Sequence, residues 1–268
     1  MKELRNQLDL LLNQSGGDKN TIEVIKSEKA VFPFSTEGRM LAYLLATQTI
    51  NYEKYMELHN EYAKRNQYLD LFDMAPRTFG ETWGEKHILG LFPEFVKATK
   101  ENISSIYPDF DGEFDLWLDG IRVEVKACRA NSTKTGGSLA SRAYLHSEAT
   151  TNGFKYHYQQ LKPSCCDVFI WIAVWLDDID IWVIPSSKIV MRPENAPRRK
   201  PKDSIVSPEG ILYMGTQHQG GKGGDVPEGQ IFVTNNHYDD LKQYKVTLDT
   251  LIKKIKEAKL NGNINQRT

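Results

Sequence analysis

The sequence has few cysteines and no long apolar run, and each of these absences excludes a class of protein. Cys128, Cys165 and Cys166 are its three cysteines, too few for a disulfide framework and not spaced as zinc ligands. The longest apolar run, residues 168–176, is about half the length of a membrane-spanning helix. The charged N-terminal residues lack the apolar core of a signal peptide. We therefore expect a cytoplasmic protein without a membrane partner.

The chain also lacks an excess of charge of either sign. Its 34 Lys and Arg residues and 35 Asp and Glu residues give a formal net charge of −1, so its total charge does not favour indiscriminate binding to nucleic acids. Aromatic residues make up 10% of the chain, which supplies enough side chains to bury and excludes disorder over most of its length. A chain of 268 residues suits one large domain, or one domain with an added subdomain.

The pattern of apolar residues changes along the chain. Residues 1–75 have helical periodicity and predict an N-terminal helical subdomain or arm, and residues 76–268 predict a second unit. Within that unit, Thr78 and Glu81 fit a capping box at a helix start. Strands are expected at 114–118, 121–127, 168–176 and 179–184. Helical structure is expected from residue 78 to residue 102 and at 242–259. This order predicts an α/β (α+β) fold with a central mixed β-sheet flanked by helices.

A tight hairpin is predicted at Asp119-Gly120, a dipeptide that favours a two-residue turn between strands. Counting outward from this turn pairs residues 116–118 with residues 121–123. The count also places Asp115 opposite Glu124, and Glu113 opposite Lys126. Directly opposed side chains lie about 5 Å apart at Cβ. The hairpin therefore predicts two carboxylates and a lysine on one face.

Two opposed carboxylates destabilise a strand pair unless something compensates their repulsion. Mg²⁺ can do so, because it prefers oxygen ligands and often takes one or two carboxylates together with phosphate oxygens. Lys126 points to the same side as Glu124 and can contact a scissile phosphate or polarise a water. These residues outline a site for metal-assisted phosphodiester hydrolysis. The alternative is a solvated face on which the acids pair with Lys126 and Arg122.

Asp115, Glu124, Val125 and Lys126 resemble the signature of the PD-(D/E)XK nuclease superfamily, and most closely that of type II restriction endonucleases. The resemblance covers about residues 76–190 and implies a restriction-endonuclease-like core. Within it, residues 154–184 resemble the crossover helix and the next core strands of these enzymes. It implies cleavage of double-stranded DNA at a specific short sequence, leaving 5′-phosphate and 3′-hydroxyl ends.

The resemblance also implies the roles of residues and partners. Catalysis would depend on Asp115, Glu124 and Lys126. One or two Mg²⁺ ions would be bound by Asp115, Glu124 and the carbonyl of Val125, with Glu85 as an accessory ligand and Glu81 as the second choice for that place. Such enzymes are prokaryotic and commonly act as homodimers on palindromic sites. A cognate DNA methyltransferase would belong to the same system without forming a stable complex.

Several alternatives remain open at the level of sequence. A literal Pro-Asp dipeptide occurs at Pro108-Asp109, so Asp109 competes with Asp115 as the metal ligand, and Asp111 is a third choice. The same core also serves repair and recombination nucleases, which act on a DNA structure or a mismatch. A third alternative is a DNA-binding module that has lost catalysis.

Three segments are predicted to contact DNA, since phosphates are held by cations and bases are read by amides and cations. The strip at 129–144 contributes Arg129, Asn131, Ser132, Lys134 and Arg142. A basic cluster contributes Arg198, Arg199 and Lys200. The loop at 215–230 contributes Gln217, His218, Gln219 and Lys222. The alternatives for these segments are a flexible surface loop and a disordered lid.

Overall fold

The computed structural model describes residues 2–27, 36–133, 136–148, 153–194, 203–216 and 228–264. The chain divides into two compact units, residues 1–67 and residues 68–268, so the boundary precedes the one predicted at residue 76. Each unit is described by itself. Among the described residues, no helix is both long enough and apolar enough to cross a membrane.

The N-terminal unit is helical, as the sequence predicted. Its helices are α1 (Lys2–Gln14), α2 (Lys19–Ser27), α3 (Thr36–Ala46) and α4 (Tyr52–Arg65). Leu8 and Leu12 of α1 pack with Met40 and Leu44 of α3 in one small core. The spacing of these residues by three or four positions places them on one face of each helix. This core explains why the apolar periodicity of the first segment is regular.

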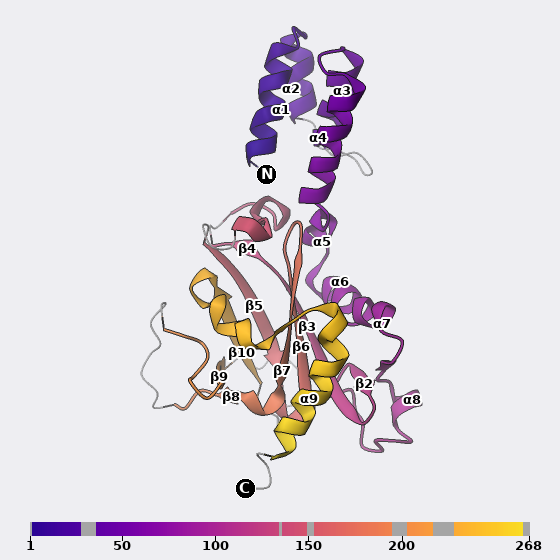
Figure 1. Cartoon of the computed structure of the whole chain (residues 1–268), viewed down its shortest axis with the longest axis vertical. Coiled ribbons are helices and arrows are strands. Elements are labelled where there is room, and N and C mark those ends of the chain that lie inside the picture. The colour runs from indigo at the N-terminus through magenta and orange to yellow at the C-terminus, as the bar shows by residue number, and fades with distance from the viewer. Residues whose placement is uncertain are drawn as a thin grey trace. The chain divides into compact units, whose positions relative to one another are not determined.

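The second unit contains two mixed β-sheets within the described residues (Figure 1). The first sheet has six strands in the order β1 (Val96–Lys97), β2 (Leu116–Leu118), β3 (Ile121–Arg129), β6 (Val168–Val174), β7 (Ile179–Pro185) and β11 (Lys245–Val246). The second has five strands in the order β4 (Asn131–Ser132), β5 (Phe154–Leu161), β10 (Gly229–Thr234), β9 (Leu212–Thr216) and β8 (Ile189–Met191). The pair β3–β6 is parallel in the first sheet, and β8–β9 is parallel in the second.

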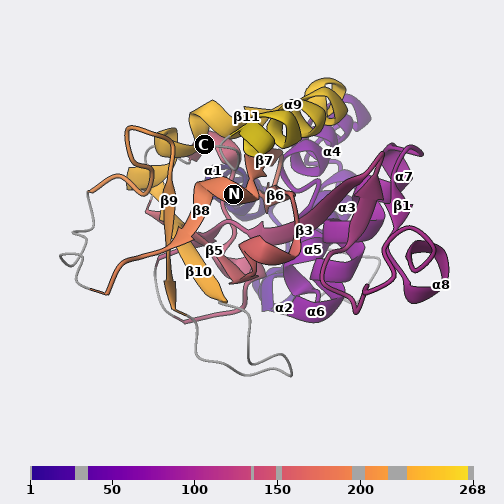
Figure 2. The same ribbon diagram turned by 90° about the horizontal axis from the view of Figure 1, so that it is seen from below.

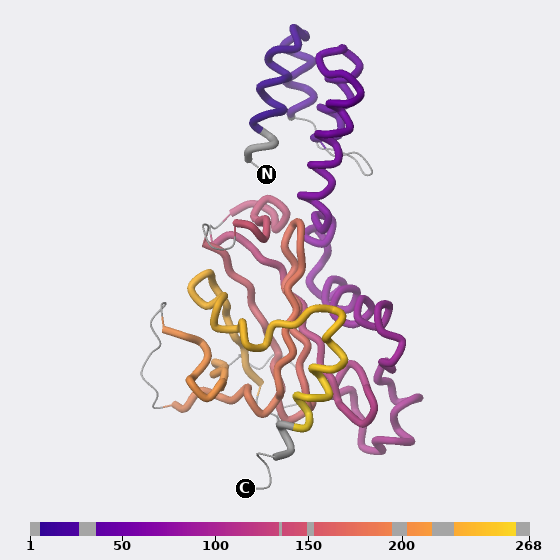
Figure 3. The backbone as a smooth tube through the Cα atoms, in the orientation of Figure 1, coloured from indigo at the N-terminus to yellow at the C-terminus, as the bar shows by residue number. Residues whose placement is uncertain are grey.

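One chain segment belongs to both sheets, because β3 continues after Ala130 directly into β4 (Figure 3). The second sheet then covers one face of the first. Cys128 of β3 and Trp171 of β6 pack with Tyr156 and Tyr158 of β5 in a common core. Even-numbered residues of β3, which include Glu124 and Lys126, therefore face the second sheet.

Helices cover the opposite face of the first sheet. The helix α9 (Leu251–Ile264) lies along β6 and β7 (Figure 2). The π-helix η1 (Gly80–Lys86) packs on β3 through Gly84, where an added Cβ would lie 3.8 Å from Val125 Cγ1. With both faces covered, every residue of β6 is buried, as the continuous apolar run predicted. The predicted mixed α/β fold is confirmed.

The second unit also holds short helices: α5 (Leu69–Asp73), α6 (Pro76–Phe79), α7 (His87–Leu91), α8 (Lys100–Ile103), and the 3₁₀ turns η2 (Ala140–Arg142), η3 (His146–Glu148), η4 (Pro163–Cys165), η5 (Ser186–Lys188), η6 (Asn235–His237), η7 (Asp239–Tyr244) and η8 (Leu248–Thr250). Several differ from the predicted helices. The capping box is wrong, because Pro76 begins α6 and Thr78 lies inside it. The C-terminal helix begins at Leu251, later than expected.

The predicted crossover helix is also wrong, since residues 154–161 form the strand β5. Phe154, Tyr156 and Tyr158 are buried, and they alternate with the exposed or half-buried Lys155 and His157. A period of two with aromatic residues on the buried face is the pattern of a half-buried strand. The connection from β3 to its parallel neighbour β6 thus passes through the second sheet.

Candidate active site

The hairpin forms at the predicted turn and in the predicted register. Asp119 and Gly120 have φ angles of 47° and 85°, the left-handed values that a two-residue turn of this kind requires at both central positions. The ladder pairs Leu118 with Ile121, Trp117 with Arg122, and Leu116 with Val123. The turn residues alone therefore fix which side chains of β3 share a face with Glu124.

The ladder ends at Leu116, earlier than predicted, because Asp115 bonds to β3 through its side chain. Its backbone N–H donates to Val123 O over 3.1 Å, and its Oδ2 accepts the Val125 N–H over 2.8 Å. The predicted Glu113–Lys126 pair does not form. Instead, the Glu113 carboxylate accepts the Asp111 N–H over 2.8 Å. Asp115 is thus anchored to the backbone between Glu124 and Lys126.

Glu124 and Lys126 form a nearly buried ion pair. The Lys126 Nζ lies 2.6 Å from the Glu124 Oε1, and the side chains are 19% and 15% exposed respectively. Burial, and then the charge of Asp115, raise the pKa of Glu124 to about 7 against the attraction of Lys126. Burial lowers the pKa of Lys126, but the charge of Glu124 outweighs it and the net pKa is raised. At neutral pH, a charged lysine therefore faces a glutamate that takes up a proton more readily than an ordinary one.

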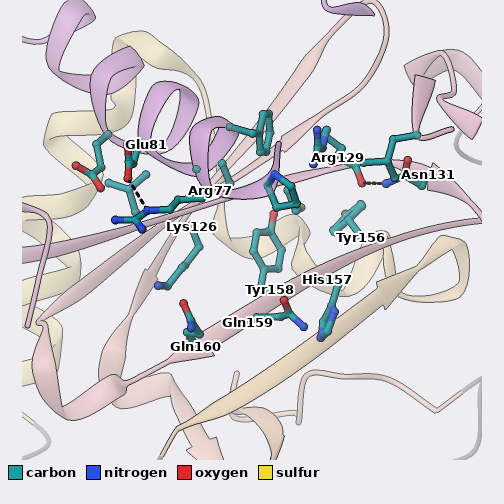
Figure 4. A pocket seen from close by; sticks show the side chains of 18 of the residues that line it. Arg77, Glu81, Lys126, Arg129, Asn131, Tyr156, His157, Tyr158, Gln159 and Gln160 are labelled. Carbon is teal, nitrogen blue, oxygen red and sulfur yellow. Dashed lines mark hydrogen bonds and ion pairs between the residues drawn. The ribbon is translucent and has the colours of Figure 1, made fainter. Parts of the chain in front are cut away.

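Asp115, Val125 and Lys126 line a cavity of about 840 Å³, and Glu124 adjoins it through its ion pair with Lys126. Tyr158, Gln159 and Gln160 of β5 also line it, and Figure 4 shows Tyr158 beside Lys126 and the two glutamines below it. The volume lies within the range of ordinary ligand sites. Asp115 and Lys126 thus meet at an accessible cavity, and Glu124 lies beside them in its ion pair with Lys126.

Glu85 and Glu81, the predicted accessory ligands, also line the cavity. Each has a cationic partner: Lys97 Nζ pairs with Glu85 Oε2, and Arg77 Nε lies 3.2 Å from Glu81 Oε1 (Figure 4). Glu85 would join a metal site only by giving up its pair with Lys97.

Of the three aspartates that competed as metal ligand, Asp115 is the one that lines the cavity within the described residues. Asp109 is exposed in the turn after α8. Asp111 pairs with Lys100, whose Nζ lies 2.6 Å from its Oδ1. The geometry therefore favours Asp115, as the hairpin argument did, over the literal Pro-Asp dipeptide.

The available donors fit Mg²⁺ better than a thiolate or imidazole metal. Among the described residues, no group of three or more His, Cys, Asp and Glu side chains could hold a metal ion. Two carboxylates, Asp115 and Glu124, and the Val125 carbonyl provide hard oxygen donors, and a substrate phosphate would complete such a set. A divalent cation there would relieve the repulsion that raises the pKa of Glu124.

The surroundings of Arg129 do not favour its predicted DNA contact, although it is among the residues that line the cavity. Its side chain is 8% exposed, and its Nη1 donates to the carbonyls of Leu71 and Met74 over 2.9 and 2.7 Å. The guanidinium also lies over the Phe79 ring, 4.5 Å from its centroid. It satisfies backbone carbonyls at the end of α5, which no local sequence pattern reveals.

The other residues of this strip have different surroundings. Ser132 is buried and accepts a hydrogen bond from Tyr144 over 3.0 Å, so its surroundings do not favour its predicted DNA contact either. Asn131 lines the cavity, with its Nδ2 donating to Arg129 O over 2.8 Å. Arg142 is half-buried, and its Nε lies 3.5 Å from Ser138 O. For Asn131 and Arg142 the DNA contact stays a prediction.

The other predicted DNA contacts lie outside the described residues and stay predictions: Lys134, Arg198, Arg199, Lys200, Gln217, His218, Gln219 and Lys222. The sequence argument in turn missed the far wall of the cavity, which includes Lys155, His157 and Gln159 of β5 and Phe232 of β10. The alternation in residues 154–161 indicates which side chains of β5 are exposed. It cannot show that β10 lies beside them.

Comparison with protein-family models, with curated proteins and with solved structures finds no match. What the chain does is therefore inferred from the residues of the cavity and their chemistry.

Proposed function

We propose that the chain is a Mg²⁺-dependent endonuclease of the restriction type, which hydrolyses double-stranded DNA at a specific short sequence and leaves 5′-phosphate ends. One observation carries this proposal. The Asp115 carboxylate is bonded to the β3 backbone at Val125, beside the nearly buried Glu124–Lys126 pair. Two neighbouring acids and a lysine, of which Asp115 and Lys126 line the cavity, are the groups that phosphodiester hydrolysis needs.

Asp115, Glu124 and the carbonyl of Val125 would hold the cation. When bound, the cation supplies Lewis acidity toward a phosphate oxygen and promotes ionisation of the attacking water. Asp115 is already oriented, because its Oδ2 accepts a hydrogen bond from the Val125 N–H over 2.8 Å. Glu124 would be deprotonated when the cation is bound, since a neighbouring cation favours the carboxylate form.

Lys126 would hold the scissile phosphate and the attacking water. Its ammonium stays charged at neutral pH because its pKa is raised, so it donates hydrogen bonds and accepts no proton. In the free chain it pairs with Glu124. Sharing Glu124 with a cation would free donors of Lys126 for a phosphate oxygen, where they stabilise the charge that develops during attack.

The remaining predictions form part of the same proposal. Action on a palindromic site predicts a homodimer with a two-fold interface. A cytoplasmic, prokaryotic setting and a cognate methyltransferase follow from the restriction role.

A repair-type nuclease that acts on unpaired or mismatched DNA is the second candidate. An exposed aromatic side chain, Phe232, on the wall of the cavity favours it, because a fully stacked duplex offers no ring face to such a side chain. The inactive DNA-binding module is less favoured, since Asp115, Glu124 and Lys126 are all present and gathered.

The test is to incubate the chain with phage DNA and Mg²⁺ and to sequence the ends. We expect discrete fragments with 5′-phosphates. Glu124→Gln and Lys126→Ala should each lower the rate by about 10³-fold or more, whereas Asp109→Asn serves as the matched control and keeps full activity. Absence of cleavage with Mg²⁺ and Mn²⁺, or equal cleavage by Glu124→Gln, would contradict the proposal.

A further inference from the structure

The cavity also carries an exposed, stacked pair of rings, which alternation along β5 places on the face of the second sheet opposite Tyr156 and Tyr158. Phe232 of β10 lies opposite His157 of β5 in the ladder. Their ring centroids are 3.6 Å apart, and the planes differ by 13°. Phe232 is nevertheless 45% exposed, and both rings line the cavity that Asp115 and Lys126 also line. A ring pair is thus presented to whatever occupies the proposed active site.

The aromatic row continues on the next strand. Gln230 pairs with Gly215 between β10 and β9, so Phe232 and Tyr213, each two residues further along, share the same face of the sheet. Tyr213 is 40% exposed. His157, Phe232 and Tyr213 therefore cross three neighbouring strands, and these three residues are called the stacking platform here.

His157 presents a fixed, uncharged ring. Its Nε2 lies 2.7 Å from Gln230 Oε1, which sets the orientation of the ring. Burial lowers the pKa of His157, and the hydrogen bond to Gln230 only partly opposes this. At neutral pH the ring is therefore not a cation for a phosphate, and its flat face is what it can offer a ligand.

A β-bulge brings amide groups beside the rings. The register between β5 and β10 shifts between Tyr158 and Leu161, where β5 has one residue more than β10. Gln160 takes the left-handed conformation there, with φ of 54°, and Gln159 and Gln160 are both exposed and line the cavity. Bulges near functional sites re-aim side chains, and Gln amides can pair with base edges.

We propose that this part of the cavity binds one unpaired nucleobase, which stacks on the platform at His157 and Phe232 and is hydrogen-bonded at its edge by Gln159 or Gln160. The substrate is then DNA with a single-stranded or extruded nucleotide next to the cleaved phosphate. A nucleotide is favoured over a peptide as the occupant because two cations that can hold a phosphate, Lys126 and Lys155, line the same cavity as His157 and Phe232. This inference rests on the proposed function.

Binding by the Glu124→Gln protein, which should not cleave, tests the proposal. The probes are three fluorescent duplexes of one sequence: fully paired, with one unpaired nucleotide, and with an abasic nucleotide at that place. Stacking of one base is worth about 1–3 kcal/mol, so we expect the unpaired base to bind roughly 5- to 150-fold more tightly than the abasic site. Phe232→Ala should remove this preference, and Phe232→Tyr should keep it.

Two further variants serve as controls. Phe232→Leu keeps an apolar side chain on β10 but loses the ring, so it should also lose the preference while its thermal unfolding stays close to that of the parent. Tyr52→Ala removes an exposed ring of the N-terminal unit and should change nothing.

Equal affinity for the unpaired and abasic duplexes, or full preference in Phe232→Leu, would overturn the stacking platform. The proposed endonuclease is judged separately by wild-type cleavage in Mg²⁺. Discrete cleavage without base preference leaves the endonuclease and removes the platform. Base preference without cleavage of any DNA does the reverse.

Discussion

Two buried carboxylates of the first sheet are treated in opposite ways by the fold. Asp180 of β7 is 1% exposed, and it accepts hydrogen bonds from Trp175 Nε1 over 2.9 Å and from Tyr238 OH over 3.0 Å. His146 Nε2 lies 3.2 Å from Asp180 Oδ2, and Lys245 forms an ion pair with Asp180. Burial raises the pKa of Asp180, but these partners outweigh it and the pKa lies below its ordinary value.

Glu124 has one cation, Lys126, and a second carboxylate, Asp115, beside it. Burial and that neighbour raise its pKa to about 7. The sequence thus provides Asp180 with four donor side chains, while Glu124 keeps an unrelieved repulsion. This difference shows that the fold can surround a buried carboxylate with enough hydrogen-bond donors and cations to keep it ionised. Where it does not, a ligand of positive charge is the natural completion.

The largest expected difference between the two acids is in cleavage. Glu124→Gln should lower the rate by about 10³-fold or more, because it removes a proposed ligand of the cation. Asp180→Asn should leave the rate per folded molecule within about threefold, because Asp180 bonds to structural partners. Single-turnover rates, corrected for the folded fraction by circular dichroism, measure this. Similar losses in both variants would erase the comparison.

Stability should show the reverse order. Asp180→Ala leaves Lys245 and three other donors without their acceptor, so we expect a loss of about 3–5 kcal/mol in the free energy of unfolding. Glu124→Gln keeps an oxygen that can accept a hydrogen bond from Lys126 and removes the repulsion by Asp115, so it should remain within about 1 kcal/mol of the wild type. Urea unfolding at pH 7 measures both. A loss in Glu124→Gln as large as that in Asp180→Ala would show that Glu124 is structural.

The pH dependence of stability sharpens the comparison. The folded pKa of Glu124, about 7, lies above its ordinary value of 4.5, so its contribution to stability is present below pH 4.5 and is lost as pH rises through 7. Asp180 has the opposite sign, because its lowered pKa gives stability at neutral pH that is lost only under acid conditions. Between pH 5 and 8, the metal-free wild type should lose about 1–3 kcal/mol more than Glu124→Gln.

Urea unfolding at several pH values, in EDTA, provides these numbers. The pKa of His146 is raised mainly by its hydrogen bond to Asp180, so its contribution also falls with rising pH. It is the same in both proteins and cancels in the difference. Parallel curves for the wild type and Glu124→Gln would mean that Glu124 is not strained.

The smallest effect concerns the bulge that borders the site. Gln160 has φ of 54°, which strains a residue with a Cβ, so Gln160→Gly should raise the free energy of unfolding by about 0.5–1 kcal/mol. Gln159→Gly is the matched control and should lower it by a similar amount. If both substitutions lower the free energy of unfolding equally, the backbone at Gln160 is not strained.

Sequence patterns a few residues long predicted the features that depend only on neighbouring residues in the chain. The hairpin register followed from Asp119-Gly120, because both turn residues must take left-handed φ angles. The buried β6 followed from its continuous apolar run. The ladder around Asp115 was predicted less well, since a side-chain hydrogen bond to Val125 replaced the expected backbone pairing.

Features set by distant parts of the chain could not be predicted in this way. Arg129 was assigned to DNA because it is a cation in a polar strip. In the structure it is buried, and its guanidinium donates to backbone carbonyls at the end of α5. The stacked pair of His157 and Phe232 depends on the pairing of β5 with β10, which no local pattern records. Charge along the sequence therefore locates a site less reliably than the alternation of its strands.

The most direct test of the central claim is a calorimetric titration of Mn²⁺ into the chain at pH 6.5, in two buffers of different protonation enthalpy. Binding should release a large fraction of one proton, because Glu124 is partly protonated before the cation arrives. Asp115→Asn and Glu124→Gln should weaken binding by about tenfold or more, and Asp109→Asn should match the wild type. Absence of binding by the wild type, or loss of binding in Asp109→Asn with retention in Asp115→Asn, would contradict the account.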